Sequence, residues 1–344
     1  FSFRSRYMDI SVVIAVRNDR CHIRECLESL WHQTRPPLEI IVTDGDSSDG
    51  TREYLEQPAA GRPAIRLLHN PAGDAASGRN LGIAHARGNI IAFIDSDATA
   101  EPDWIDTIAS RFAALSDERI AGIGGPDIPV CDGSPVSRAI NIVLASPLAS
   151  GGSLNPSVQH RVVGEECAVR HIPTCNLAVG KELFLKEGVF DPLMYKAEDL
   201  EFSTRLCKRG YRFLYSPAIR VLHHKKTSIK AFARQIFKWG YGKALVMKKH
   251  GPEPICIAPI LAVLTVLISV AAAAVRPDLI AVPAGFLTAY AVVIAAESAR
   301  LAGRSMRLIP LLALLLAVVH GAGTAGIVCG LLNRPLNIQH TEKK

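Results

Sequence analysis

The chain has 344 residues, a hydrophobic fraction of 49% and a formal net charge of +7. This composition excludes a disordered chain, which combines low hydrophobicity with high charge. Eight cysteines without a CxxC pair exclude a small disulfide scaffold, and we expect reduced, mostly buried thiols. At about 150 residues per domain, the length predicts two units.

Up to about residue 250, apolar runs alternate with amphipathic stretches. Strands are predicted at residues 9–16, 38–43, 65–69, 89–94 and 218–222, and helices at 20–33, 51–57, 75–87, 103–115 and 198–209. The first run is too short for a secretory signal peptide. The alternation predicts an α/β, Rossmann-like fold with a mostly parallel central sheet.

Acidic side chains follow two of the predicted strands. Asp44 follows the second, and Asp95 and Asp97 follow the fourth. Because ligands of such sheets bind beyond the carboxyl ends of the strands, these residues are expected at one edge. Asp95 and Asp97, two positions apart, can face one Mg²⁺ or Mn²⁺ ion. Asp44 fits either a contact to a base or ribose, or a turn before Thr51.

Four further side chains have both a functional and an ordinary structural interpretation. Arg79 fits a phosphate contact or a solvated helix face. Glu198 and Asp199 open a predicted helix, where they complement the helix dipole or supply a general base. His223 follows a predicted strand and is a candidate for contact with metal or phosphate.

The sequence changes character after residue 250. Residues 254–275 and 279–296 carry no charge, and 308–333 contain His320 but no Asp, Glu, Lys or Arg. Each stretch is long enough for a transmembrane helix, whereas three buried helices of a soluble protein are the alternative. The arginines between the second and third stretches predict a cytoplasmic loop. We therefore expect a multi-pass protein of the inner (cytoplasmic) membrane whose N-terminal domain faces the cytoplasm.

A basic amphipathic stretch at residues 228–250 precedes these spans. Its pattern predicts a helix at the membrane surface, where its lysines and arginines attract anionic lipid. This accounts for the positive charge without nucleic acid, for which no motif is present. The expected organisation is a globular domain at 9–227, this helix, and spans within 254–333. The region 127–170, rich in Gly, Ser and Pro, is expected to shape an acceptor site.

Six segments in order resemble glycosyltransferase family 2, over most of residues 9–245: ISVVIAVRND, IIVTDGDSSDGT, SGRNLGIAHARG, IIAFIDSD, TCNLAV and EDLEFSTRLCKRGYR. The resemblance is to a membrane-attached branch of that family. It implies the GT-A fold, a Mn²⁺ or Mg²⁺ cofactor, and transfer of a sugar from a nucleotide-sugar donor with inversion.

The resemblance also implies roles for individual residues. Donor-binding roles fall on Ala15, Arg17, Asp44, Arg79, Asp95 and Ser96. Metal-binding roles fall on Asp95, Asp97 and His223. Asp199 becomes the catalytic base, with Glu198 beside it. The family usually has proline where this chain has Ala15, and Gly45-Asp46 replaces the usual Asp-Gly, so Asp46 receives no role.

Gln235 and Trp239 belong to a stretch, QIFKW, that resembles the QxxRW of processive polysaccharide synthases with lysine for arginine. Lysine lacks the planar fork of arginine, and three spans are few for a polymer channel. We therefore expect a membrane-bound enzyme that adds one sugar, from a UDP-sugar such as UDP-glucose, to a lipid-linked or membrane-proximal glycan in polysaccharide biosynthesis. The alternatives are a processive synthase, a non-catalytic nucleotide-sugar sensor, and a transporter, which the lack of paired charges in the spans disfavours.

Overall fold

The computed structural model describes residues 8–57, 63–149, 164–252 and 254–332. It divides into two compact units. The α/β unit comprises Phe1–Cys131 and Ser153–Lys225, and the helical unit comprises Asp132–Gly152 and Lys226–Lys344. The globular domain expected at residues 9–227 is therefore interrupted, because residues 132–152 group with the C-terminal helices.

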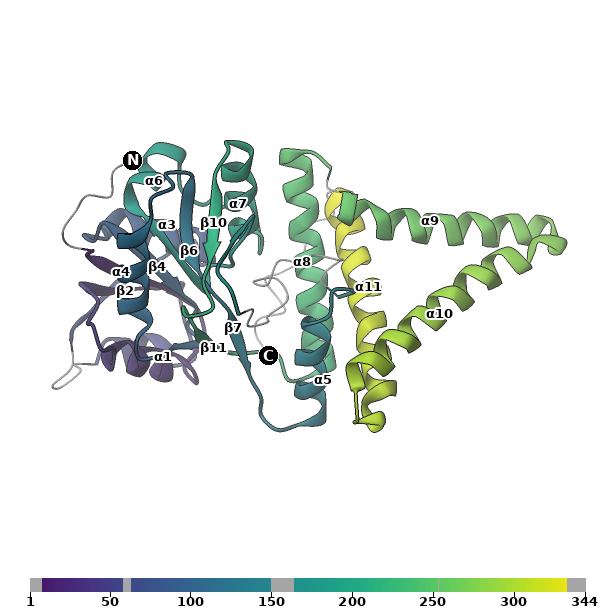
Figure 1. Ribbon diagram of the computed structural model, residues 1–344, viewed down its shortest axis with the longest axis horizontal. Helices are drawn as coiled ribbons and strands as arrows, with labels where there is room; N and C mark the ends of the chain where they lie inside the picture. Colours follow the sequence, from purple (N-terminus) through teal and green to yellow (C-terminus); the bar gives the residue numbers. More distant parts are fainter. Residues whose placement is uncertain (1–7, 58–62, 150–163, 253, 333–344) are drawn as a thin grey trace. The chain divides into compact units, whose positions relative to one another are not determined.

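An eight-stranded mixed sheet forms the α/β unit (Figure 1). Its strands, in spatial order, are β3 (Ile65–His69), β2 (Glu39–Asp44), β1 (Ile10–Val16), β4 (Ile90–Ile94), β9 (Asn176–Gly180), β6 (Ile120–Gly124), β10 (Arg212–Tyr215) and β8 (Cys167–Val169). β9 runs antiparallel to β4 and β6, and β8 runs antiparallel to β10, while the other pairings are parallel. The parallel strands therefore end at one edge, as the alternating sequence predicts.

A second, three-stranded sheet lies in the order β5 (Ala98–Ala100), β11 (Val221–His224) and β7 (Asp127–Val130). β5 begins directly after the Asp95–Asp97 segment and pairs antiparallel with β11, so that Ala98 lies opposite His223. The sequence placed His223 after its strand, whereas the structure places it inside β11. This pairing brings His223 beside the acidic segment.

Helices cover both faces of the large sheet. They are α1 (Ile23–Trp31), α2 (Thr51–Leu55), α3 (Ala75–His85), α4 (Trp104–Ala114), α6 (Lys181–Glu187) and α7 (Glu198–Lys208). Successive residues of β1 alternate between two cores: Val12 packs with α1 and α4, and Val13 with α3, α6 and α7. Burial on both faces explains why the strands are apolar at almost every position.

Helix α3 lies close to the sheet because two of its positions are glycine. A Cβ at Gly78 would lie 2.8 Å from Thr43 Oγ1, and one at Gly82 would collide with Val13. Any larger side chain would push α3 outward. These glycines therefore set the position of Arg79, the next residue along the helix after Gly78.

The described part of the helical unit holds five longer helices: α5 (Pro135–Leu144), α8 (Ile229–His250), α9 (Pro254–Val275), α10 (Ala281–Ala302) and α11 (Ile309–Leu331), with short 3₁₀ turns η1 (Pro277–Leu279) and η2 (Met306–Leu308). α8 and α11 lie side by side (Figure 1). A Cβ at Gly240 would collide with the carbonyl of Gly323, and one at Gly326 with the carbonyl of Phe237. The two backbones therefore touch where glycine removes the side chain.

The apolar face of α8 packs inside the helical unit. Phe232 and Ile236 are buried in a cluster with Ile140 of α5 and Leu312 and Leu315 of α11. A stripe of this kind suits a helix that packs on a neighbour as well as one that lies on lipid. The predicted location of α8 at a membrane surface therefore stays a prediction.

Among the described residues, two segments are long and apolar enough to cross a membrane. They are Pro277–Ala302 and Met306–Leu331, with mean hydropathies of 2.2 and 2.1. In α9, the described apolar part, Ile260–Val275, is shorter than the 18 residues taken as the minimum for a span. Length and composition thus support two of the three predicted spans, and the third stays a prediction.

Candidate active site

Arg79 joins two sequence motifs at the carboxyl edge of the large sheet. Its Nη2 donates a hydrogen bond to Asp95 Oδ1 at 2.9 Å, and its Nη1 donates to Glu198 Oε1 at 2.5 Å. Asp95 follows β4, and Glu198 is the first residue of α7. Segments about a hundred residues apart in sequence therefore meet through one guanidinium group.

Burial makes these charges interdependent. The Arg79 side chain is 8% exposed and that of Glu198 is 10% exposed. Burial alone would lower the pKa of Arg79, but the carboxylates of Asp95, Glu198 and Asp199 raise it above its ordinary value. Burial, together with the charge of Asp199, raises the pKa of Glu198, although Arg79 opposes this shift. Arg79 is therefore cationic at every physiological pH.

Asp95, Asp97 and His223 supply a candidate site for a divalent metal ion. One ligand atom from each lies within 4.8 Å of the others. His223 Nε2 is 3.0 Å from Asp97 Oδ1. Two carboxylates and one imidazole suit Mn²⁺, and the carboxylates also suit Mg²⁺. The chemistry of these residues therefore fits the divalent ion that the sequence predicted.

Asp127, Lys225 and Cys175 contact His223, and the sequence analysis assigned none of them to the metal site. Asp127 Oδ2 lies 3.3 Å from His223 Nδ1, pairs with Lys225 Nζ, and accepts a weak hydrogen bond from Cys175 Sγ at 3.7 Å. Burial and Lys225 oppose protonation, but hydrogen bonds to Asp127 and Asp97 raise the pKa of His223 well above its ordinary value. Partners of this kind fix the orientation of a metal-binding imidazole. Lys225 directly follows β11, two positions after His223, and this spacing was visible in the sequence.

Asp44 has the burial and the unpaired oxygen expected of a residue that contacts a bound ligand. It is the last residue of β2 and is 1% exposed. Its Oδ2 accepts from Ser47 N at 3.3 Å and lies 3.9 Å from Arg52 Nη1. Its buried Oδ1 has no hydrogen-bond partner among the residues that the structure describes. An unsatisfied buried oxygen is costly, and an N–H or O–H of a bound ligand would satisfy it.

Asp199 lies beside Glu198 in the first turn of α7. Its side chain is 23% exposed, and its Oδ2 is 4.0 Å from His171 Nε2. His171 Nδ1 lies 3.0 Å from Ser203 Oγ, which holds the ring in place. His171 precedes β9 in an irregular segment that gave no sequence signal. Asp199 therefore combines solvent access with a fixed position, as a general base requires.

The other predicted donor-binding residues lie on the same side of the sheet. Ala15 is half-buried in β1 opposite Thr43. Arg17 is exposed, and its Nη1 donates to the carbonyl of Gly73 at 3.3 Å. Ser96 donates through Oγ to Asp19 Oδ2 at 2.6 Å. The hydroxyl of Ser96 is thus engaged within the protein.

Gln235 and Trp239 lie on α8, in the helical unit. Trp239 is half-buried against the apolar cluster of that unit. Their part in binding donor or acceptor stays a prediction.

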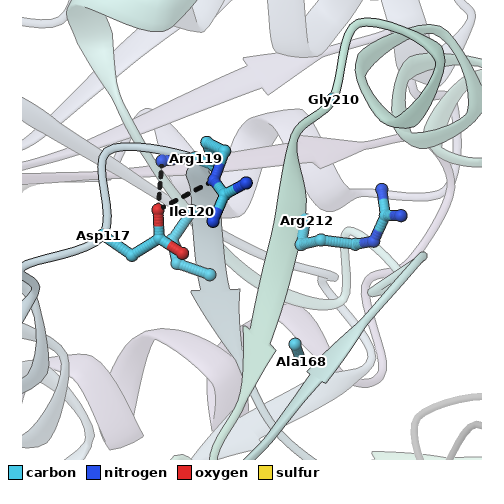
Figure 2. Close-up of a pocket in the computed structure, with 6 residues that line it drawn as sticks. All are labelled: Asp117, Arg119, Ile120, Ala168, Gly210 and Arg212. Carbon is cyan, nitrogen blue, oxygen red and sulfur yellow. Dashed lines mark hydrogen bonds and ion pairs between the residues drawn. The ribbon is translucent and has the colours of Figure 1, made fainter.

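A pocket elsewhere on the α/β unit differs from this site. It has a volume of about 260 Å³ and is lined by Asp117, Arg119, Ile120, Ala168, Gly210 and Arg212 (Figure 2). Ile120 begins β6 and Arg212 begins β10, so the pocket lies at the amino ends of these parallel strands. It is therefore at the edge opposite to Asp44, Asp95 and Asp97.

The mixed α/β fold, with acidic side chains gathered at the carboxyl edge of its sheet, is of the GT-A type of transferase, and comparison with known proteins identifies the family. The sequence model described as "Glycosyl transferase family 2" matches residues 11–122, and that described as "Glycosyl transferase family group 2" matches residues 90–328. The chain belongs to glycosyltransferase family 2.

A solved structure shows the same fold. The mannosyltransferase PcManGT from Pyrobaculum calidifontis, in complex with GDP-Man and Mn²⁺, aligns with a TM-score of 0.59 at 21% identity. The alignment covers 96% of this chain and 89% of that protein. The predicted α/β GT-A fold is therefore confirmed.

Three curated relatives match this chain over 236 to 250 residues. EpsH of Bacillus subtilis is 39% identical over 236 residues, which is 67% of this chain and 65% of EpsH. The succinoglycan biosynthesis protein ExoA of Rhizobium meliloti is 26% identical over 248 residues, 71% of either chain. The pre-mycofactocin glycosyltransferase of Mycobacterium tuberculosis is 27% identical over 250 residues, and the match spans 48% of its length.

Proposed function

We propose that the protein is a membrane-bound, inverting glycosyltransferase. It transfers one sugar from a nucleotide-sugar donor to a hydroxyl group of a lipid-linked or membrane-proximal glycan. The observation that carries this proposal is the Arg79 bridge between Asp95 and Glu198. It unites the candidate metal ligands with Asp199, the candidate base, at the edge where such sheets bind ligands.

Each of these residues has a distinct task in the reaction. Asp44 Oδ1 accepts a hydrogen bond from the base or ribose of the donor. Arg79 holds Asp95 and places positive charge beside the diphosphate. Asp199 accepts the proton of the acceptor hydroxyl as that oxygen attacks the anomeric carbon. A divalent ion at Asp95, Asp97 and His223, when bound, supplies Lewis-acid stabilisation of the departing diphosphate.

The proposed acceptor and location follow from the helical unit. Among its described residues, two segments are apolar and long enough to cross a membrane. A relative from Methanococcus voltae, 24% identical over 246 residues, is named for transfer to a dolichyl phosphate sugar. We place the α/β unit on the cytoplasmic face of the inner membrane, in a multi-pass topology, with a UDP-sugar such as UDP-glucose as donor in polysaccharide biosynthesis.

The test uses the full chain in native membranes. UDP-, GDP- and dTDP-sugars are supplied with a lipid-linked oligosaccharide extract, and products are analysed by mass spectrometry. We expect one donor to add a single hexose mass, and nuclear magnetic resonance to show inverted anomeric configuration. Asp199→Asn is the negative control. Absence of transfer with every donor, or retained configuration, would contradict the proposal.

Processive synthesis is the second candidate, because the QIFKW stretch of α8 resembles a motif of processive synthases. The products of the transfer assay above distinguish single addition from processive synthesis. One added sugar supports the single-addition proposal, whereas a ladder of lengths supports processive synthesis. Donor binding without hydrolysis or transfer would instead support a nucleotide-sugar sensor.

A further inference from the structure

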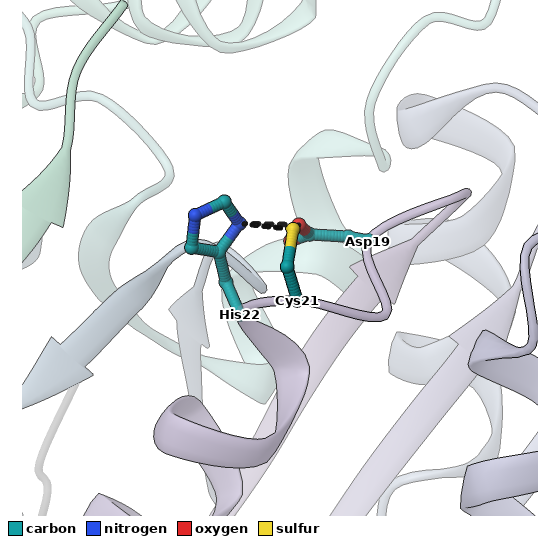
Figure 3. A group of neighbouring side chains, drawn as sticks. All are labelled: Asp19, Cys21 and His22. Atoms are coloured by element: carbon teal, nitrogen blue, oxygen red, sulfur yellow. Dashed lines mark hydrogen bonds and ion pairs between the residues drawn. The ribbon is translucent and has the colours of Figure 1, made fainter.

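Three side chains of different chemistry converge on the loop between β1 and α1 (Figure 3). His22 Nδ1 lies 2.6 Å from Asp19 Oδ1 and 3.3 Å from Cys21 Sγ. Cys21 Sγ lies 3.7 Å from Asp19 Oδ1. A carboxylate, a thiol and an imidazole thus surround one point outside the Asp95–Asp97 site.

This geometry differs from that of a nucleophilic triad. In a triad the orienting carboxylate and the nucleophile contact opposite nitrogens of the histidine ring. Here Asp19 and Cys21 both contact Nδ1 of His22. Partial burial and the neighbouring Asp19 also raise the pKa of the Cys21 thiol, which disfavours a reactive thiolate. Convergence on one point is instead the arrangement of ligands around an ion.

The donor set indicates which ion would bind. One thiolate, one imidazole and one carboxylate suit Zn²⁺, whereas Mg²⁺ prefers oxygen ligands alone. Three protein ligands leave the fourth tetrahedral position for water. Cys21 is exposed, contrary to the expectation of mostly buried thiols, so an ion can reach it from solvent.

The loop that carries these ligands is held in place. Asp19 N donates to Thr51 Oγ1 at 3.0 Å, and Arg20 N donates to Asp49 Oδ2 at 3.0 Å. The ring of His22 lies 4.7 Å, centroid to centroid, from that of His224. Ligands on a fixed backbone lose less conformational entropy when an ion binds.

We propose that Asp19, Cys21 and His22 form a binding site for Zn²⁺ that inhibits the enzyme. Asp19 Oδ2 accepts the hydrogen bond from Ser96, the residue between Asp95 and Asp97. When the ion binds, the Cys21 thiol releases its proton to water. The Nδ1 proton of His22 also leaves to water, so that Nδ1 binds the metal and Nε2 carries the remaining N–H of the neutral ring, and Asp19 Oδ1 turns from His22 toward the metal. That rotation strains the bond from Ser96 and displaces the Asp95–Asp97 segment. The inhibition rests on the proposed glycosyltransferase activity, whereas the binding does not.

Binding is tested on the purified full chain with Co²⁺ as a spectroscopic substitute for Zn²⁺. With Mg²⁺ present to fill the Asp95–Asp97 site, we expect a thiolate-to-cobalt absorption band that saturates and that disappears when Zn²⁺ is added. Cys21→Ala should abolish the band and weaken Zn²⁺ binding by at least about 10- to 100-fold, because it removes a ligand. Cys131→Ala, which changes another exposed cysteine, should keep the band. A band that is absent from the parent protein, or that persists in Cys21→Ala, would overturn the site.

Inhibition is tested separately, at saturating Mn²⁺ or Mg²⁺. Micromolar Zn²⁺ should slow sugar transfer by the parent protein and by Cys131→Ala, and leave Cys21→Ala unaffected. Cysteine-dependent Zn²⁺ binding with unchanged transfer would overturn the coupling through Ser96. If no donor supports transfer, the proposed function fails, and the cobalt titration still decides whether the ion binds.

Discussion

The α/β unit and the helical unit are each stabilised internally by a different kind of contact. In the α/β unit, charged groups are buried at the ends of strands, and each needs a partner, as Arg79 needs Asp95 and Glu198. In the helical unit, α8 and α11 touch through glycines, where the absence of a side chain allows contact. The comparison teaches that losing a side chain should damage the first unit, and gaining one should damage the second.

The largest effect is expected for the residue that performs proton transfer. Asp199→Asn should reduce the rate of transfer by about 10²- to 10⁴-fold, because the amide cannot accept the acceptor proton. Donor binding should be unchanged, which calorimetry with the nucleotide sugar measures. Glu182→Gln, an exposed acid on α6, is the matched control. Transfer by Asp199→Asn at the parent rate would rule out this base.

Removal of the buried cation should unfold the α/β unit more readily. Arg79→Gln leaves Glu198 and Asp95 without their counter-charge, which typically costs about 3–5 kcal/mol for a buried pair. Chemical denaturation followed by tryptophan fluorescence measures the loss. Arg119→Gln, at an exposed pair with Asp117, should leave the midpoint unchanged. An equal shift of the denaturation midpoint in Arg79→Gln and Arg119→Gln would show that the buried pairs contribute no more to stability than the exposed pair.

The metal ligands should control the dependence of transfer on divalent ions. Chelation with EDTA should stop transfer, and added Mn²⁺ or Mg²⁺ should restore it. Asp127→Asn weakens the contact that orients His223. This variant should raise the Mn²⁺ concentration for half-maximal activity by about 10-fold or more. Full activity in EDTA would contradict a metal at Asp95 and Asp97.

Adding a methyl group should have a smaller effect, and it should depend on position within α11. Gly326→Ala places a Cβ against the carbonyl of Phe237, and overpacking of this kind costs about 1–3 kcal/mol. Gly321→Ala meets no atom within 4 Å and should be neutral or stabilising, since alanine favours the helix. Thermal unfolding of both variants in detergent distinguishes them. Equal melting temperatures would mean that the close contact of α8 with α11 contributes nothing.

The sequence predicted those parts of the site that depend on local pattern. Asp44 and Asp95 could be placed at one edge because both follow apolar strands, and parallel strands end together. Asp127 and His171 could not be found, since their role depends on contacts with residues tens of positions away in sequence. The antiparallel β9 between β4 and β6, and the grouping of α5 with the C-terminal helices, have the same long-range origin. The amphipathic pattern of α8 also could not show whether its apolar face packs on a neighbouring helix or on lipid, because both environments favour the same pattern.

The proposed mechanism requires that Asp44, Asp95 and Asp97 bind a nucleotide-sugar donor together with a divalent ion. Titration calorimetry with nucleoside diphosphates tests this requirement. UDP, GDP and dTDP are titrated in turn into the full-length protein with Mn²⁺, with EDTA, and after Asp97→Asn. The site described here predicts that one nucleotide binds with Mn²⁺ and that EDTA or Asp97→Asn removes this binding. Binding of equal strength under all three conditions, or binding of none of the nucleotides with Mn²⁺, would contradict it.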